Sequence, residues 1–235
     1  YAQLEPRCFA HCSNEQKLID SFKDGKDFYG TLAVDLFDLD CTADEVKAKY
    51  PDIRFQAKVA GLATAYGAKR WKLSKILNIS EKKAEEFREN YFKKYSNLAK
   101  YIRQCQGHVL LKGWIANETG RIRHLPDSKK LKGKKDRKSV REFHGMLNLA
   151  VNYPIQSLAA SIINRAMIKM TELFKKENMN AHIIMTVHDE VIVECEERIA
   201  LKCHKIMKET MEQTYTLNVP LLSEPIIGKN LSECK

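Results

Sequence analysis

The sequence predicts an α+β fold in which helices predominate and a short β-hairpin stands near the C-terminal end. Residues 42–101 have an almost continuous helical pattern. Two apolar, β-branched runs, 182–187 and 191–194, flank a charged triplet and predict the hairpin. A second long helix is predicted over 155–176, because apolar residues recur there at steps of three and four: Ile155, Leu158, Ile162, Ala166, Met170 and Leu173.

The remaining segments complete the order of elements. Residues 1–37 begin as a short mixed segment and continue as a polar helix over 14–22, for which Gly25 is a stop signal. A charged helical stretch follows Ser80, and either Asn78 or Ser80 is suited to cap it. Residues 107–141 combine glycines with many basic residues, which predicts a loop.

Length and charge bound the classes of function. The chain has 235 residues, 44% hydrophobic and 30% charged, which suffices for one substantial core or two small ones. Lys and Arg number 40 against 30 Asp and Glu, a formal net charge of +10. Such an excess favours a polyanionic partner, nucleic acid first. Composition alone equally fits a basic protein whose charge only keeps it in solution.

The cysteines and the chain ends indicate a compartment. The sequence has 7 Cys and no Cys-x-x-Cys pair, so we expect reduced thiols in an intracellular, cytoplasmic protein. It has neither a signal-like apolar start nor a long apolar span. Because the chain begins at Tyr1 rather than at Met, we expect a fragment, a processed product or one half of a split protein.

A cationic stripe is the first candidate for chemistry. If 54–66 is helical, Arg54, Lys58, Leu62 and Tyr66 lie one above another, with Gly67 placed to close the helix. Two cations followed by an apolar and an aromatic side chain match the polarity of a nucleoside triphosphate. Taken alone, an ordinary amphipathic helix with two solvated cations explains the pattern better.

The predicted hairpin bend is the second candidate. A tight turn made of His188, Asp189 and Glu190 lacks the usual Asn-Gly or Asp-Gly pair. A carboxylate held there by apolar strands suits Mg²⁺, which takes one or two protein carboxylates together with substrate phosphates. Taken alone, a polar surface turn explains the triplet better.

In combination, these patterns resemble the second and third signature motifs of the family A DNA polymerases. Other segments match that family in the same order, so that the resemblance covers nearly the whole chain. These are Tyr1-Ala-Gln3-Leu-Glu5-Pro-Arg7, Gly120-Arg121-Ile-Arg123-His-Leu125-Pro126, Asn152-Tyr-Pro154-Ile-Gln156, Val219-Pro220 and Gly228-Lys-Asn230. The resemblance implies template-directed DNA synthesis.

The resemblance also implies a domain organisation. Residues 13–143 correspond to a helical fingers subdomain. Residues 1–12 and 144–235 correspond to a palm, in which an antiparallel sheet carries the catalytic hairpin and residues 1–12 begin as a strand beside it. We expect the rest of the polymerase, including the thumb and any exonuclease, to lie in an N-terminal portion.

Nucleotide-binding roles follow for the matching positions. The resemblance implies that Arg54 and Lys58 bind the triphosphate of the incoming dNTP and that Lys58 donates a proton to the leaving pyrophosphate. Tyr66 stacks near the templating base pair, and Glu5 excludes a ribose 2′-hydroxyl. The remaining nucleotide-binding positions are Gln3 and Leu62.

Metal and DNA contacts follow in the same way. Asp189 binds the two Mg²⁺ ions, while His188 and Glu190 support the primer end and the metal site. The second carboxylate is expected immediately before Tyr1, in the N-terminal portion. Contacts with the primer–template are expected from Asn152, Gln156, Arg121, Arg123 and Gly67.

Three positions depart from the family pattern. Leu62 stands where Phe or Tyr is usual, so the ring face beside the nucleotide is lost. Asn148 replaces a common Arg, and Pro6 replaces a common Leu in a way that is typical of phage-type members.

Basic residues are concentrated between residues 129 and 141. Their positions are Lys129, Lys130, Lys132, Lys134, Lys135, Arg137, Lys138 and Arg141. The run fits a solvated, flexible loop and equally fits a phosphate-contacting insertion in the fingers.

Two other functions stay open from the sequence. One is a non-catalytic primer–template-binding fragment, or a subunit of a split polymerase. The other is a single-subunit RNA polymerase, against which Glu5 and the triplet 188–190 argue.

Overall fold

The computed structural model describes residues 1–234 and divides them into two compact units. The first unit consists of Tyr1–Phe9 and residues 155–234, and the second consists of Ala10–Pro154. Two helices, α1 (Leu4–Ser13) and α10 (Arg137–Lys176), run across the unit boundaries. None of the described helices combines the length and the apolarity that a membrane crossing requires.

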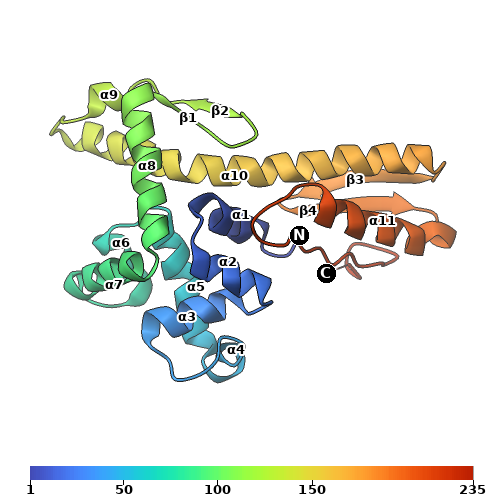
Figure 1. Cartoon of the computed structure of the whole chain (residues 1–235), viewed down its shortest axis with the longest axis horizontal. Helices are drawn as coiled ribbons and strands as arrows, with labels where there is room; N and C mark the ends of the chain where they lie inside the picture. Colours follow the sequence, from blue (N-terminus) through green and yellow to red (C-terminus); the bar gives the residue numbers. More distant parts are fainter. Residues whose placement is uncertain (235) are drawn as a thin grey trace. The chain divides into compact units, whose positions relative to one another are not determined.

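The second unit is mostly helical (Figure 1). Its helices between α1 and α10 are α2 (Gln16–Lys23), α3 (Phe28–Phe37), α4 (Val46–Lys49), α5 (Pro51–Ala65), α6 (Arg70–Leu77), α7 (Glu81–Lys94), α8 (Ser96–Lys112) and α9 (Ser128–Leu131). The strands β1 (Trp114–Ala116) and β2 (Ile122–His124) pair antiparallel between α8 and α9.

Local signals explain several helix ends in this unit. The Ser80 side chain accepts a hydrogen bond from the Lys83 amide and caps α7, as predicted. Asp27 caps α3 by accepting from the Tyr29 amide. Asn78 ends α6 with a φ of 53°, a left-handed conformation that asparagine tolerates.

The second unit has two described apolar clusters. One gathers side chains of α8, the β1–β2 hairpin and the first part of α10: Cys105, Val109, Ile115, Leu125, Ala150 and Val151. The other gathers side chains of α5, α6 and α7: Ala60, Ala68, Leu73, Leu77 and Ala84. These clusters fix α5, on which Arg54, Lys58 and Leu62 stand, and the start of α10, on which Asn152 stands.

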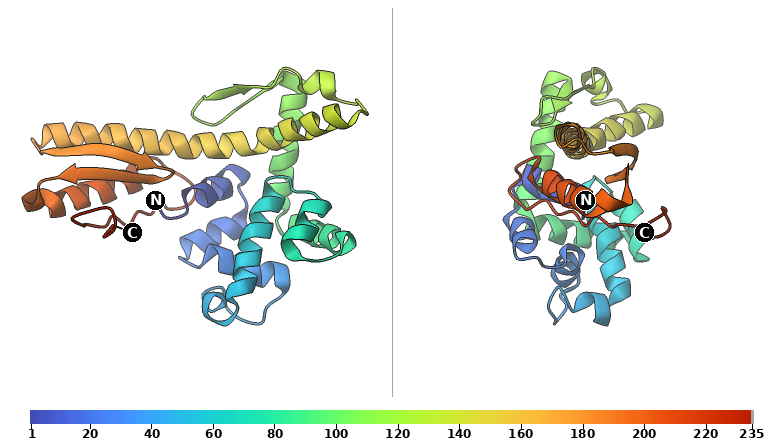
Figure 2. Two further views of the ribbon diagram at one scale, coloured as in Figure 1. Left: turned by 180° about the vertical axis from the view of Figure 1, so that it is seen from behind. Right: turned by 90° about the vertical axis from the view of Figure 1, so that its right-hand side faces the viewer.

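The first unit contains the predicted hairpin. Strands β3 (Ala181–Val187) and β4 (Glu190–Cys195) pair antiparallel, with Ala181 opposite Cys195 and Val187 opposite Glu190. A short 3-10 turn (Glu197–Ile199) leads into α11 (Ala200–Gln213). The hairpin and α11 lie along the C-terminal half of α10, and an extended tail follows α11 (Figures 1 and 2). The α+β fold class is therefore confirmed.

The side chains that α10 buries in this unit follow the predicted apolar stripe. Ile155, Leu158, Ile162, Ala166 and Met170 are all fully buried. The stripe therefore serves as the core face of α10, because apolar side chains at steps of three and four share one side of a helix.

The N-terminal strand that we expected is wrong for residues 4–13, which form helix α1. Leu4, Cys8 and Phe9 recur at helical spacing and are buried, so a helix buries them together whereas a strand would separate them. Tyr1–Gln3 precede the helix, Gln3 has a φ of 56°, and the Ala2 amide donates to the Leu222 carbonyl oxygen.

Two further expectations need correction. Residues 107–141 are not a loop, since α8 continues to Lys112 and a hairpin and α9 follow. The long helix starts at Arg137 rather than at Ile155 and contains Pro154. Burial of Val151 and Ile155 on either side of the proline offsets the hydrogen bond that it removes. The predicted domain boundaries, 12/13 and 143/144, fall inside α1 and α10, and the assignment of palm and fingers stays a prediction.

Candidate nucleotide- and metal-binding site

The bend of the β3–β4 hairpin presents one carboxylate. Because Val187 pairs with Glu190, the turn consists of His188 and Asp189 alone. His188 has a φ of 54°, a left-handed conformation that is uncommon for a residue with a bulky side chain. A non-glycine residue held in this conformation is a feature that occurs at functional sites.

The N-terminal segment is anchored beside this bend. The Tyr1 amino group donates to the Asp189 carbonyl oxygen at 2.9 Å, and the Tyr1 hydroxyl donates to the Met211 carbonyl oxygen at 2.8 Å. Arg7 is buried and donates to the carbonyl oxygens of Ala2 (2.8 Å) and Pro220 (2.6 Å). Burial lowers the pKa of the Arg7 guanidinium. Arg7 therefore ties residues 1–3 to the C-terminal tail, a role that its sequence motif did not reveal.

The donor set at the bend fits a hard cation. Asp189 is partly exposed and Glu190 is exposed, and both offer oxygen ligands of the kind that Mg²⁺ prefers. Asp189 belongs to the turn, whereas Glu190 is the first residue of β4. No group of three or more His, Cys, Asp or Glu side chains suited to a metal occurs among residues 1–234. Asp189 is therefore the carboxylate that the turn itself offers, and its role as a metal ligand stays a prediction.

The predicted nucleotide-binding residues stand on and beside α5, within the second unit. Arg54, Lys58 and Leu62 lie at one-turn intervals on this helix, as the sequence predicts, whereas Tyr66 is its C-terminal cap. Arg54 and Leu62 are partly buried, whereas Lys58 is exposed. Two cations one turn apart repel each other, so this arrangement needs neighbouring groups that offset their charge.

Asp27 and Tyr29 provide that offset. Arg54 forms a bidentate ion pair with Asp27, in which Nη2 donates to Oδ1 at 2.8 Å and Nε donates to Oδ2. The hydrogen bond with Asp27 is the main cause that raises the pKa of Arg54. The Tyr29 ring lies beneath both cations, 5.5 Å from the Arg54 guanidinium carbon and 5.1 Å from Lys58 Nζ. No local sequence pattern pointed to either partner, because Asp27 and Tyr29 stand at the start of α3, far from Arg54 in the chain.

Gly67 closes α5 in close contact with α10. It has a φ of 88°, and a Cβ atom at this position would lie 2.2 Å from Asn148 Oδ1. Asn148 and Gly67, two positions that the sequence comparison with the family singled out separately, are therefore neighbours within the second unit.

The predicted DNA-binding residues have different environments. Arg121 lies directly before strand β2, Arg123 lies within it, and both are exposed. Gln156 is exposed on α10. Asn152 has a buried Oδ1 atom that lacks a hydrogen-bond partner among the described residues. A buried amide oxygen of this kind is costly unless a donor reaches it, so a bound ligand is one way to satisfy it.

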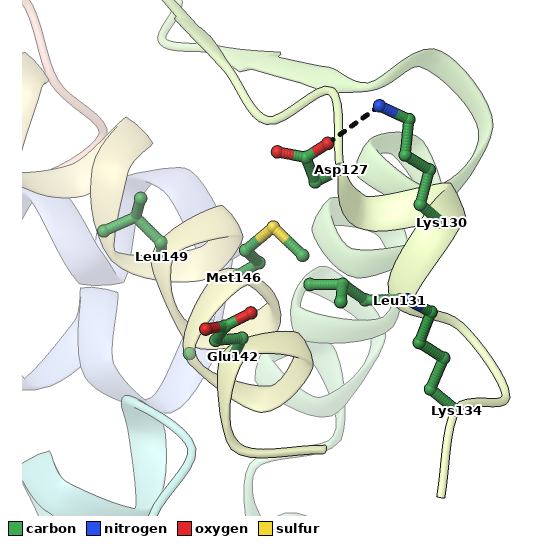
Figure 3. A pocket seen from close by; sticks show the side chains of 8 residues that line it. Asp127, Lys130, Leu131, Lys134, Glu142, Met146 and Leu149 are labelled. Atoms are coloured by element: carbon green, nitrogen blue, oxygen red, sulfur yellow. Dashed lines mark hydrogen bonds and ion pairs between the residues drawn. The ribbon is translucent and has the colours of Figure 1, made fainter. Parts of the chain in front are cut away.

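The basic segment forms α9, the following turn and the start of α10 (Figure 3). All eight of its cations are exposed, and Lys130 is paired with Asp127 at 3.2 Å. Beside them lies a hollow of about 470 Å³, into which Leu131, Met146 and Leu149 project, while Lys130, Lys134 and Glu142 stand at its sides. The cations therefore face solvent and are available to phosphates.

Comparisons with known proteins agree with this arrangement of motifs. The family model described as DNA polymerase family A matches residues 1–233. The chain is 34% identical over its full length to DNA polymerase I of Bacillus caldotenax and 32% identical to the thermostable DNA polymerase I of Thermus filiformis. It covers 25% and 26% of those proteins, so it spans about a quarter of the curated relatives that it matches.

A solved structure is similar in fold as well. The POL domain of Pol1 from M. smegmatis, in complex with DNA primer-template and dNTP, superposes with a TM-score of 0.84 at 30% sequence identity. The match covers 94% of this chain and 37% of that one. The phage-type assignment suggested by Pro6 stays a prediction. The match of the family model over nearly all residues shows that the chain belongs to DNA polymerase family A.

Proposed function

We propose that this chain forms the fingers and part of the palm of a DNA-directed DNA polymerase, which transfers a nucleotide from a dNTP to the 3′-hydroxyl of a primer. The observation that carries the proposal is Asp189 at the hairpin bend, with the N-terminal segment anchored beside it at 2.9 Å. In this reading, the first unit is palm and the second unit is fingers, and primer–template DNA and dNTPs are the partners. The solved relative with DNA primer-template and dNTP supports this choice of ligands.

The residues of α5 would bind the nucleotide. Arg54 retains three N–H donors beyond the two that Asp27 accepts, and Lys58 offers three donors on an exposed ammonium. Both cations would hold the triphosphate, and Lys58 would protonate the leaving pyrophosphate. Tyr66 would stack near the templating base pair, with Leu62 in apolar contact. Gln3 and Glu5 would bound the sugar, and Glu5 would exclude a 2′-hydroxyl.

The palm would supply the metal ligands and the primer contacts. Asp189 would hold two Mg²⁺ ions, which when bound acidify the 3′-hydroxyl and stabilise negative charge on the triphosphate. His188 and Glu190 would support the primer end. A second carboxylate would come from a residue preceding Tyr1, because the described residues offer only the Asp189–Glu190 pair at the bend.

DNA contacts would come from several elements. Asn152 and Gln156 would reach acceptor groups in the minor groove, which all base pairs share, so that they sense pairing geometry rather than sequence. Gly67 would let the backbone approach the template. Arg121, Arg123 and the basic segment 129–141 would contact phosphates, for which exposed positive charge suffices.

A second candidate is a primer–template-binding subunit that performs no chemistry alone. Asp189 is the one carboxylate within the two-residue turn, which favours this candidate, since two Mg²⁺ ions need more than one bridging ligand. The two candidates differ in whether the metal- and nucleotide-binding residues are needed for nucleotide incorporation.

Primer extension by the complete polymerase separates the candidates. Asp189→Asn should reduce single-nucleotide incorporation by about a hundredfold or more, because loss of a metal ligand removes several kcal/mol of charge stabilisation. Glu194→Gln, on the same hairpin but away from the bend, is the matched control and should behave as the parent. Undiminished incorporation by the Asp189 variant would refute the catalytic role.

A further inference from the structure

The packing between α3 and α5 places an aromatic ring under the proposed triphosphate-binding cations. α3 and α5 approach closely where α5 carries Gly61, at which a Cβ atom would lie 3.3 Å from Leu32 Cδ1. Tyr29, in the first turn of α3, is 8% exposed and packs edge-on against Phe28 with ring centroids 5.2 Å apart. The Tyr29 ring is therefore fixed in orientation by its neighbours.

Both cations stand over this single ring. The Arg54 guanidinium carbon and Lys58 Nζ lie 5.5 Å and 5.1 Å from its centroid, within the range in which a ring face attracts a cation. The negative face of the ring offsets part of the repulsion between two like charges one turn apart. It also gives Lys58, whose flexible ammonium is otherwise exposed, a preferred position.

Asp27 is the second group at the start of α3 that holds Arg54 in place. Its carboxylate holds Arg54 by two hydrogen bonds and is itself fixed as the cap of α3, where Oδ1 accepts from the Tyr29 amide at 3.2 Å. The Asp27 amide in turn donates to Asp44 Oδ1. The Asp27 carboxylate and the Tyr29 ring thus belong to one hydrogen-bonded turn, in which the carboxylate contacts Arg54 and the ring contacts both cations of α5.

We propose that Tyr29 is a positioning residue for nucleotide binding, in which the face of its ring holds Arg54 and Lys58 in place for the triphosphate. The inference rests on the proposed function of α5. The aromatic ring of Tyr29, rather than its hydroxyl group, has this role, because both cations lie over the ring. A positioning role of this kind lowers the entropy that the two side chains lose when the triphosphate arrives.

The test compares substitutions at residue 29 in the complete polymerase. Tyr29→Phe keeps the ring and should leave the dissociation constant for dNTP within about twofold of the parent. Tyr29→Leu keeps an apolar side chain but removes the ring, and should raise that constant about tenfold, the combined effect of two cation–π contacts. The dissociation constant for primer–template should not change in either variant. Equal losses in both variants, or no loss in the leucine variant, would overturn the role of the ring.

A second series of variants at position 29 avoids the cavity that Tyr29→Leu would leave in the core. Phenylalanine analogues with one, two and three ring fluorines have nearly the same shape but a progressively weaker negative face. Introduced at position 29, they should raise the dissociation constant for dNTP stepwise while the melting temperature stays level. A flat series would overturn the proposal.

Controls distinguish this inference from the proposed function itself. Lys58→Met should lower nucleotide binding, and combining it with Tyr29→Leu should cost less than the sum of the two single effects, because both remove the same contact. If Asp189→Asn and Lys58→Met both leave incorporation intact, the proposed function fails. If both impair incorporation while Tyr29→Leu matches Tyr29→Phe, only the role of Tyr29 fails.

Discussion

The amino nitrogen of Tyr1 lies 2.9 Å from the carbonyl oxygen of Asp189, so residues that are 188 positions apart in the chain meet at the hairpin bend. A residue joined to the Tyr1 nitrogen would therefore stand beside Asp189. This proximity supports the proposed second metal ligand, because a residue attached there would lie next to the Asp189 backbone.

Catalysis should depend on that carboxylate. Two Mg²⁺ ions that are roughly 3.5–4 Å apart repel strongly, and Asp189 alone offsets too little of that repulsion. We expect the isolated 235-residue chain to show no primer extension above background with Mg²⁺ and all four dNTPs. Addition of an N-terminal polymerase fragment that ends in Asp should restore extension, which is measured by gel electrophoresis of a labelled primer. Robust extension by the isolated chain would instead identify Glu190 or Glu5 as the second ligand.

Lys58→Ala in the complete polymerase should reduce nucleotide incorporation by about two orders of magnitude, because a cation aimed at the triphosphate stabilises charge that develops during transfer. Affinity for primer–template should persist, as measured by fluorescence anisotropy. Lys17→Ala, an exposed lysine on α2, is the matched control and should leave both quantities unchanged. A normal incorporation rate in the Lys58 variant would mean that α5 has another role.

The basic segment should determine how binding to DNA depends on salt. Each phosphate contact contributes roughly 0.9 to the slope of log affinity against log salt concentration for duplex DNA. Replacement of Lys129, Lys130, Lys132, Lys134 and Lys135 by Gln should therefore flatten the slope by about one to four. Deletion of residues 129–138 should act in the same direction.

The comparison for this measurement is a variant with charge removed elsewhere in the same unit. Gln at Lys82, Lys83 and Lys93, all exposed on α7, changes net charge without touching the basic segment. An equal decrease of the slope per charge removed in both variants would show that only net charge matters and that the segment faces away from DNA.

Gly67→Ala should destabilise the second unit by about 1–2 kcal/mol through its left-handed backbone alone, with a further loss from the contact with Asn148. Asn148→Ala in the same chain should relieve the contact but not the backbone strain, so recovery should be partial. Gly107→Ala, in α8 with open space around it, should instead stabilise by about 0.5–1 kcal/mol. Urea denaturation followed by circular dichroism measures all three changes.

Several elements could be predicted from the sequence because one local signal determined them. The β-branched runs around the triplet 188–190 gave the hairpin, and the capping role of Ser80 gave the start of α7. Four-residue spacing correctly placed Arg54, Lys58 and Leu62 along α5. In each case the decisive interaction involves residues that are close in sequence.

Other features depend on tertiary packing and escaped prediction. A proline at position 154 predicts a helix that starts there, yet α10 continues through it. Burial of the flanking side chains, Val151 and Ile155, outweighs the hydrogen bond that Pro154 cannot donate. The strand expected from family resemblance at residues 1–12 overlooked the helical spacing of Leu4 and Cys8. The support of Lys58 by Tyr29 joins residues 29 positions apart, and no local pattern announces such a contact.

The β3–β4 hairpin has a consequence for handling the protein. It is a two-stranded sheet among the described residues, and Ile184, Met185 and Val187 on β3 are exposed. Open strand edges with apolar side chains readily pair with extended segments of other molecules. The separately expressed chain should therefore self-associate and precipitate at high concentration. Co-expression with the preceding polymerase portion should keep it dispersed.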